Sequence, residues 1–289
     1  MSGAATEVDF GAELREQMKA TLRRLSRTGA LPSLPAAASA ALGIARDPDA
    51  DIDKLARVIQ TDVGLSARVL RAANAVTIGR RAPARKLGDA IVTLGLRRTC
   101  ELLVAACARQ LYEVSSPRAE ALWAHALAVA VACEELARIT RLAEPGQAFL
   151  PGLFHDVGRV ALLLADERSL EVIDWMVDAG EGQRLECERE WYGFDHAEAG
   201  AMLAEDWGLA LGQCDAIRGH HDPARAGAAE GLAKLLNAAD WLAYQLGHGT
   251  GREAPGDVTL ASVGLAEADA ESCAEQVREG LARQREILA

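Results

Sequence analysis

The sequence has few aromatic residues and no long apolar run, and both shortages narrow the fold class. Aromatic side chains make up 4% of the 289 residues, whereas Ala and Leu dominate the 50% that are hydrophobic. Strict alternation of apolar and polar residues, which is typical of half-buried strands, is almost absent, so the sequence predicts an all-α protein. The longest apolar stretch, Ala121–Cys133, includes His125 and spans 13 residues. It is shorter than the roughly 18 residues that a membrane-spanning helix needs.

The cysteines and the charged residues exclude further classes. None of the six cysteines belongs to a CxxC pair, and most fall on apolar helical faces. They are therefore interpreted as small core residues, not as a disulfide framework or a zinc cluster. The first ten residues, MSGAATEVDF, have neither the basic region nor the apolar core of a signal peptide, so we expect a cytoplasmic protein. A formal charge of −11 argues against a nucleic-acid binder.

N-cap residues and helix breakers divide the chain into helices. Asp51 and Asp62 each precede apolar residues at helical spacing, and Asp195 and Glu198 have the spacing of a capping box. The segment VSSPRAE, residues 114–120, is the best candidate for a boundary. The expected parts are a lead-in helix over 1–28, an N-terminal helical subdomain over 29–115, a helical bundle over 116–250, and a C-terminal helical segment over 251–289 that docks on the bundle.

Five of the six histidines form an ordered series with two aspartates, whereas His248 lies in a Gly-rich loop and is given no role. The series is His125, His155 with Asp156, His196, His220 with His221, and Asp240. Taken singly, each is explained as a hydrogen-bonded core side chain or a capping acid. Taken together, imidazoles and carboxylates are the ligands of Zn, Mn, Fe or Ni, and helical bundles build two-metal sites from facing helices. A buried carboxylate beside a buried imidazole, as in GLFHDVGRV, also needs a partner for both groups. The series therefore predicts a site for a divalent metal ion.

A second candidate site is a basic segment in the first half of the chain. Between Arg71 and Arg98 there are seven basic residues and one acid, Asp89. The candidates for contact with a partner or a nucleotide are Arg80, Arg81, Arg85, Lys86, Arg97 and Arg98. The alternative is a solvated loop with cations near helix ends. The segment has no aromatic residue on which single-stranded bases could stack, so an acidic protein or a nucleotide fits better than a nucleic acid.

The order of the histidines and aspartates is similar to the HD superfamily of metal-dependent phosphohydrolases, and the first half of the chain narrows the resemblance. Similarity to the HDOD domain, the HD-related output domain of bacterial signalling proteins, is carried by LPSLPAAASAALGIARDPDADIDKLARVIQTDVGLSARVLRAANA and KLGDAIVTLGLRRTCELLVA. It continues in GLFHDVGRVAL, DHAEAGAMLAEDWGL and AIRGHHDP, over roughly residues 28–250. The resemblance implies an all-α fold in which an N-terminal helical subdomain packs on an HD-like helical bundle.

The resemblance also implies a function. The HDOD family is mostly regulatory and non-catalytic, so the first hypothesis is a signal-transduction module that binds a partner protein. The alternative is a metal-dependent phosphohydrolase, with Arg159 on a phosphate oxygen and two metal ions. One ion would be held by His125, His155, Asp156 and Asp240, and the other by His196 with His220 or His221. A metal held without turnover lies between these two hypotheses. A nucleic-acid-binding regulator is a third, which the net charge disfavours.

Two departures from the HD-GYP relatives bear on the phosphohydrolase hypothesis. Arg159 stands where those enzymes usually have Lys, and no GYP element follows HHDPARAGAAEG. A guanidinium can still hold a phosphate as a bidentate fork. The missing GYP element argues against hydrolysis of cyclic-di-GMP.

Overall fold

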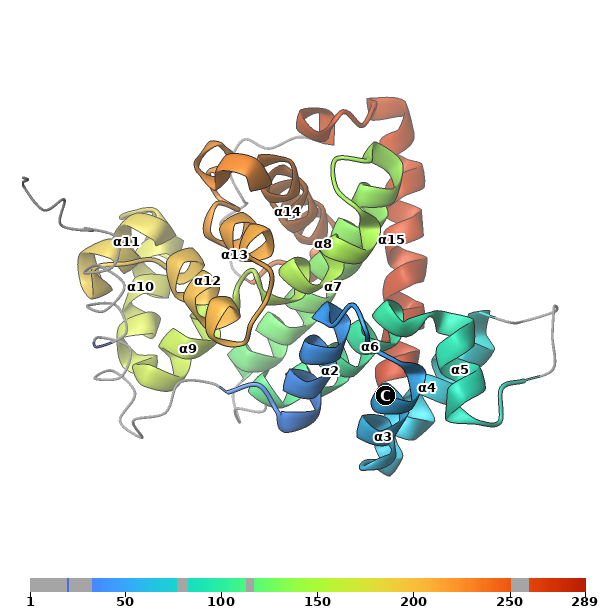
Figure 1. The fold of residues 1–289 in the computed structure, drawn as a ribbon. Helices are drawn as coiled ribbons and strands as arrows, with labels where there is room; N and C mark the ends of the chain where they lie inside the picture. Colours follow the sequence, from blue (N-terminus) through green and yellow to red (C-terminus); the bar gives the residue numbers. More distant parts are fainter. Residues whose placement is uncertain (1–19, 21–32, 77–82, 113–116, 251–259) are drawn as a thin grey trace, which may run out of the picture.

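The protein is all-α, as the composition predicts. The computed structural model describes residues 20, 33–76, 83–112, 117–250 and 260–289, and these ranges contain helices and turns but no strand (Figure 1). The predicted lead-in helix over 1–28 lies outside the described residues, apart from residue 20.

The first half of the described chain is a group of short helices. They are α2 (Ala36–Arg46), α3 (Ile52–Gln60), α4 (Val63–Val76), α5 (Leu87–Leu94), α6 (Leu96–Ala108) and the 3₁₀ turn η1 (Arg109–Tyr112). Both predicted N-caps are confirmed. The Asp51 carboxylate accepts from the Lys54 amide at 2.6 Å, and the Asp62 carboxylate accepts from the amides of Gly64 and Leu65 at 2.7 and 3.1 Å.

The second half is a bundle around the long helix α7. Its helices are α7 (Pro117–Thr140), α8 (Pro145–Phe154), α9 (Val157–Ala165), α10 (Glu167–Ala179), α11 (Arg184–Tyr192), α12 (His196–Asp206), α13 (Leu211–Arg218), α14 (Glu230–Ala243) and α15 (Glu267–Leu288). Three short turns, η2 (Pro223–Ala229), η3 (Tyr244–His248) and η4 (Leu260–Val263), join the last of them. Helix α7 is buried on most of its circumference because α8, α14 and α15 all pack against it.

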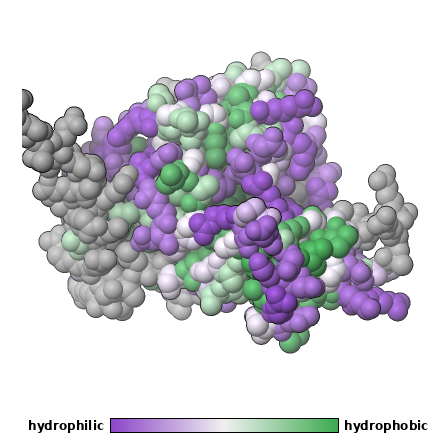
Figure 2. Space-filling view, in the orientation of Figure 1, coloured by the Kyte–Doolittle hydropathy of each residue, from purple (hydrophilic) through white to green (hydrophobic). Residues whose placement is uncertain are grey.

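The two halves share one hydrophobic core. Helix α2 packs on α6 and α6 packs on α8, so the short helices lie directly against the bundle. Helix α15 runs beside α7 and reaches α4, where the Arg68 Nε donates to the Leu288 carbonyl at 2.9 Å (Figure 1). The face drawn in Figure 2 is largely hydrophilic, with hydrophobic residues in separate patches.

One segment is apolar enough to span a membrane by length and composition. It is Pro145–Ala165, which contains α8 and α9, and 89% of its most apolar window is buried inside the protein. The burial accounts for the composition, because both helices are surrounded by the rest of the bundle. His155, Asp156 and Arg159, which interrupt this segment, belong to the site described next.

Candidate metal centre

The HD pair occupies the turn between two buried helices. His155 and Asp156 lie between the end of α8 and the start of α9. Helix α8 approaches α7 closely at Gly152, where a Cβ would lie 2.7 Å from the Ala130 Cα. Helix α9 approaches the start of α12 at Gly158 in the same way, since a Cβ there would lie 2.0 Å from the His196 carbonyl oxygen. Two glycines therefore allow the turn to sit against α7 and α12.

Helix α12 presents His196 at its first position. The predicted capping box is confirmed: Asp195 accepts from the Glu198 amide at 2.9 Å and Glu198 accepts from the Asp195 amide at 3.3 Å. Because the cap starts the helix at this point, the His196 imidazole is directed inward, where its exposed fraction is 2%.

Asp156 lies at the centre of the imidazoles. Its Oδ1 is 3.2 Å from the His196 Nε2, 3.6 Å from the His155 Nε2 and 3.9 Å from the His220 Nε2. Its Oδ2 is 3.8 Å from the His125 Nε2. The carboxylate therefore faces ring nitrogens that come from four separate parts of the bundle.

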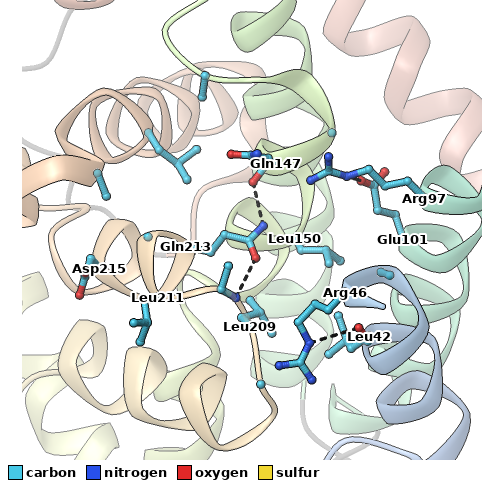
Figure 3. Close-up of a pocket in the computed structure, with 18 of the residues that line it drawn as sticks. Leu42, Arg46, Arg97, Glu101, Gln147, Leu150, Leu209, Leu211, Gln213 and Asp215 are labelled. Atoms are coloured by element: carbon cyan, nitrogen blue, oxygen red, sulfur yellow. Dashed lines mark hydrogen bonds and ion pairs between the residues drawn. The ribbon is translucent and has the colours of Figure 1, made fainter. Parts of the chain in front are cut away.

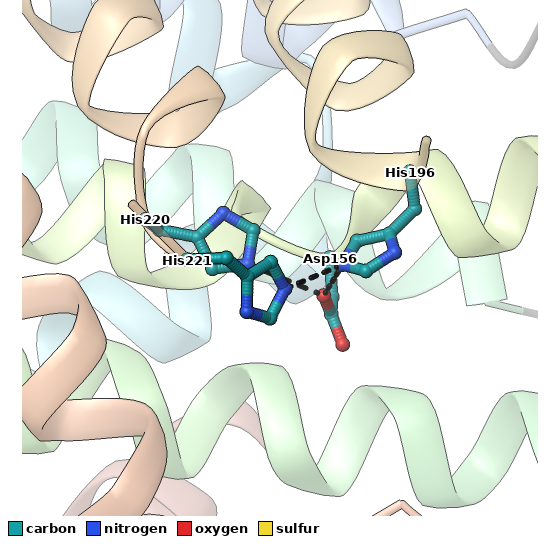
Figure 4. Close-up of side chains that lie close together, drawn as sticks. All are labelled: Asp156, His196, His220 and His221. Carbon is teal, nitrogen blue, oxygen red and sulfur yellow. Dashed lines mark hydrogen bonds and ion pairs between the residues drawn. The ribbon is translucent and has the colours of Figure 1, made fainter. Parts of the chain in front are cut away.

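Two groups of side chains share this carboxylate, and between them they contain six of the seven predicted metal ligands. One group is His125, His155 and Asp156; the other is Asp156, His196, His220 and His221 (Figure 4). The seventh, Asp240 on α14, adjoins the first group, with its Oδ1 3.2 Å from the His125 Nε2. The structure thus brings the whole series together, in an arrangement that allows Asp156 to bridge two ions.

The outward nitrogen of each buried imidazole is already hydrogen-bonded. The Nδ1 atoms of His125, His155 and His220 lie 2.6–2.8 Å from the carbonyl oxygens of His248, Gly152 and Ile217. A carbonyl only accepts, so each Nδ1 carries a proton and Nε2 is the nitrogen that faces inward, with a lone pair wherever the ring is neutral. These are the tautomers that metal ligation requires.

His196 has a carboxylate in the same position. The Glu188 Oε2 accepts from the His196 Nδ1 at 2.6 Å and from its backbone amide at 2.8 Å. Burial opposes the charged imidazole, but Glu188 and Asp156 outweigh burial and raise the pKa of His196 to about 10. Without a metal ion, this ring therefore keeps a proton that balances the carboxylates.

The close approaches of the ring nitrogens fit a divalent cation. The Nε2 atoms of His125 and His155 are 3.1 Å apart, and those of His196 and His221 are 2.9 Å apart. Without an ion, the proton that His196 keeps can lie between its Nε2 and that of His221. Where both facing rings are neutral, two inward lone pairs at this distance would repel each other unless a cation lay between them. The His220 Nε2 is buried and has no hydrogen-bond partner among the described residues. Burial together with His155 and His196 lowers the pKa of His220 to about 4. The ring is therefore neutral at neutral pH, and its Nε2 lone pair can bind a metal ion.

Arg159 closes the site on the side of α9. Arg159 is 7% exposed, and its Nη1 lies 3.0 Å from the Asp156 Oδ2 and donates to the Thr250 hydroxyl. In this arrangement Arg159 neutralises the central carboxylate. Its predicted contact with a phosphate stays a prediction.

Three supports of the site were not predicted from the sequence. Glu188 lies on α11, a mainly polar helix, and no spacing rule links it to His196. His248 takes part through its backbone carbonyl, which carries no side-chain signal. Asn237 donates to the His220 carbonyl at 2.7 Å, and its position on the buried face that carries Asp240 was the only available hint.

The basic candidates lie in different surroundings. Arg80 and Arg81 are outside the described residues, and Arg85 and Lys86 are exposed just before α5. Arg98 is paired with Glu101 and Glu134 at 3.2 and 3.0 Å. Arg97 lies 3.6 Å from Glu101 through its Nε. Arg97 and Arg98 therefore share one buried carboxylate.

Comparisons with known proteins agree with this architecture. A family model described as the HDOD domain matches residues 31–223. A solved structure of a provisionally named phosphohydrolase from Shewanella amazonensis is 27% identical, with a TM-score of 0.70 over 93% of this chain and 98% of that one. An HDOD domain protein with unknown function from Geobacter sulfurreducens is 25% identical, with a TM-score of 0.72 over 95% and 98% of the two chains.

Two weaker similarities extend the comparison. A provisionally named signal transduction protein from Marinobacter aquaeolei has the same fold, at 23% identity and a TM-score of 0.69, over 98% of this chain and 66% of that one. An uncharacterized protein of Treponema pallidum is 24% identical over 194 residues. That match covers 66% of this chain but 38% of the relative, so the chain spans well under half of the relative's length.

Proposed function

The chain belongs to the HDOD domain family, and we propose that it is a signal-transduction module whose HD-type centre holds divalent metal as part of its core, without turnover. The similarity to an HDOD domain protein and the naming of the Marinobacter aquaeolei relative for signal transduction support a regulatory role.

The burial of the ligand set is the observation that carries the proposal. Six of the seven candidate ligands have exposed fractions between 0 and 6%: His125, His155, Asp156, His196, His220 and Asp240. A catalytic metal site keeps an open position and room for a substrate. Here Arg159 closes onto Asp156 and Thr250 instead. The centre is built like a structural metal site that joins several helices.

The described residues divide naturally between two ions. His125, His155, Asp156 and Asp240 would hold one, and His196, His220 and His221, with Asp156 shared, would hold the other. Bound divalent ions would supply positive charge between the facing imidazoles and cross-link α7, α12, α14 and the turns after α8 and α13. Since the ions bind only the folded chain, they would stabilise it by mass action. Glu188 and the three carbonyls hold the rings in the required tautomer.

The partner that we propose is a signalling protein with an acidic surface. Arg85 and Lys86 are the exposed members of the basic segment within the described residues, and they offer a positive site on a chain of net charge −11. A cytoplasmic location stays a prediction, and nucleic acid is disfavoured by the same net charge.

A metal-dependent phosphohydrolase is the second candidate function. Asp156 belongs to both groups of ligands, which is the arrangement that two-metal hydrolysis uses. The Shewanella amazonensis relative is provisionally named a phosphohydrolase. For catalysis, Thr250 would have to move away from Arg159 so that a substrate could enter the site.

Metal content and hydrolysis distinguish the two candidates. The purified protein and an H155A/D156A variant are analysed by inductively coupled plasma mass spectrometry and assayed with bis(p-nitrophenyl) phosphate. We expect bound Fe, Mn, Zn or Ni that is lost in the variant, and no hydrolysis. Metal-dependent hydrolysis that disappears in the variant would establish the phosphohydrolase instead. Absence of metal after reconstitution would leave a hydrogen-bonded cluster.

A further inference from the structure

A cavity lies between the two halves of the protein. It has a volume of about 650 Å³ and is separate from the histidines of the metal centre. Helices α2 and α6 form one wall, and α8, α13 and the start of α14 form the other (Figure 3). A ligand in this pocket would therefore touch both halves at once.

The first turns of four helices open into the pocket. In each of these helices the second residue lines the pocket: Arg97 of α6, Gly146 of α8, Gly212 of α13 and Gly231 of α14. The backbone amides of the first turn have no partner inside a helix, and the helix dipole makes this end positive. Among the described residues, the amides of Leu211 and Gly212 donate to nothing. Converging helix starts of this kind favour an anion.

Two arginines add positive charge from the wall that α2 and α6 form. Arg97 reaches α8, where a Cβ on Gly146 would lie 3.1 Å from its Nε. Arg46, at the end of α2, reaches the loop before α13, where a Cβ on Gly208 would lie 2.8 Å from its Nη1 and Nη2. Within the described chain, the Arg46 side chain makes one hydrogen bond, from Nε to the Leu42 carbonyl at 3.4 Å. Its terminal amino groups are therefore available to an anionic ligand.

The pocket also offers an acceptor and an apolar surface. Glu101 is 4% exposed, and its Oε1 faces the Arg97 Nε at 3.6 Å but accepts no hydrogen bond from the described residues. Burial outweighs the neighbouring Arg98 and raises the pKa of Glu101 to about 7. The remaining lining is mostly apolar and includes Leu42, Leu150, Leu209 and Leu232. Such a surface suits an organic group that carries an N–H donor.

We propose that this pocket binds a nucleotide-sized organic phosphate. The phosphate would be held by Arg46, Arg97 and the first-turn amides of α13, and the organic part would lie on the leucines with a donor toward Glu101. The volume argues for this size, since pockets for small organic ligands are typically about 300–1,000 Å³ and inorganic phosphate would fill a small part of the cavity.

The position of the pocket connects it to the metal centre. Helix α8 begins in the pocket and is followed directly by His155. Helix α13 begins in the pocket, and its last turn contains the Ile217 carbonyl that accepts from the His220 Nδ1. At 1.5 Å per residue, each helix spans roughly 12–15 Å between the two sites. A ligand that draws in the starts of these helices would move the supports of two metal ligands. The pocket would then be the input site of the regulator, a role that rests on the proposed function.

Calorimetric titration of the full chain tests the binding site directly. The probes are the four ribonucleoside 5′-monophosphates, the corresponding triphosphates, and inorganic phosphate in a separate titration. We expect at least one nucleotide to bind more tightly than ~1 mM, and the G212L and R46Q variants to weaken that binding by at least ~10-fold. A Cβ at Gly212 meets nothing within 4 Å, so G212L fills the pocket without disturbing the fold.

The matched control is G88L. Gly88 is likewise the second residue of an eight-residue helix, a Cβ there also meets nothing within 4 Å, and it does not line the pocket. Equal nucleotide binding by the wild type, G212L and G88L would overturn the proposal. So would the failure of every nucleotide to bind, or binding of inorganic phosphate as tightly as any nucleotide.

Metal titrations separate this inference from the proposed function. Nucleotide binding is measured on the chain with and without added metal, so failure of the metal centre would leave the result on the pocket intact. A saturating nucleotide should change the metal affinity of the wild type and leave that of G212L unchanged. No change in the wild type would overturn the role as an input site.

Discussion

Replacing Glu188 with Gln should weaken the metal centre without removing a predicted metal ligand. The Glu188 side chain is fully buried, and its Oε2 accepts from both the His196 Nδ1 and the His196 amide. The amide of Gln keeps the shape and one acceptor but removes the negative charge that holds the ring. The variant therefore tests an outer support of the site.

The magnitude follows from these two hydrogen bonds. A hydrogen bond to a charged group contributes about 1.5–3 kcal/mol to stability, and loss of an outer support of a metal ligand typically costs 10–100-fold in metal affinity. Both bonds go to the same oxygen, so the Gln amide oxygen can still accept them, but without the negative charge each becomes weaker. We expect metal affinity to fall about 10–100-fold and the metal-free protein to lose about 1–3 kcal/mol of unfolding free energy.

Competition titration with a chelating dye measures the affinity, and urea denaturation of the metal-free protein measures the stability. The matched control is E186Q, which changes an exposed acid on the same helix and should alter neither quantity. If E188Q binds metal within about twofold of the wild type, the assignment of His196 as a metal ligand held by Glu188 is wrong.

Three further outcomes are expected. Removing metal with a chelator should lower the melting temperature. The loss is equivalent to about 4 kcal/mol of unfolding free energy if the free metal had been 1,000-fold above its dissociation constant. If the chelator removes bound metal and the melting curve does not change, the metal has no structural role. Glu101 has a pKa of about 7 in the fold and an ordinary value of 4.5, so its contribution to stability is complete below pH 4.5 and is lost as the pH rises through 7. Urea denaturation across that range should therefore show stability falling with pH in the wild type and a flatter profile in E101Q. Finally, G158A should destabilise the fold by about 1–3 kcal/mol or more, because its Cβ would lie 2.0 Å from the His196 carbonyl oxygen. The control G88A should leave stability unchanged, since a Cβ there meets nothing within 4 Å. Equal denaturation midpoints for the two variants would show that α9 and α12 can separate at no cost.

Local patterns in the sequence predicted the helical fold and the candidate ligands well. The caps at Asp51, Asp62 and Asp195 depend on residues within three positions, so their effect could be recognised without a structure. The family resemblance implied the HDOD architecture, which the family model and the Geobacter sulfurreducens structure confirm. The boundaries of the predicted parts and the role of the exposed basic residues stay predictions.

The environment of the predicted residues was beyond the reach of these patterns. Arg97 and Arg98 were grouped with Arg85 and Lys86 because the four are near one another in sequence. In the structure, Arg98 is paired with Glu101 and Glu134, and Arg97 faces a pocket that was not anticipated. A sequence run of one charge therefore did not identify which of its members remain free on the surface.

The sequence by itself determined that the chain is helical, where several helices begin, and that seven imidazole and carboxylate side chains are available as ligands. Only the tertiary structure decided that these side chains converge, that six of the seven are sealed from solvent, and which ring nitrogen of each buried histidine faces inward. The physical reason is the range of the interactions. A cap acts over three residues, whereas the His125 imidazole is oriented by a carbonyl 123 positions away, and the pocket depends on four helix starts that the folded chain brings together.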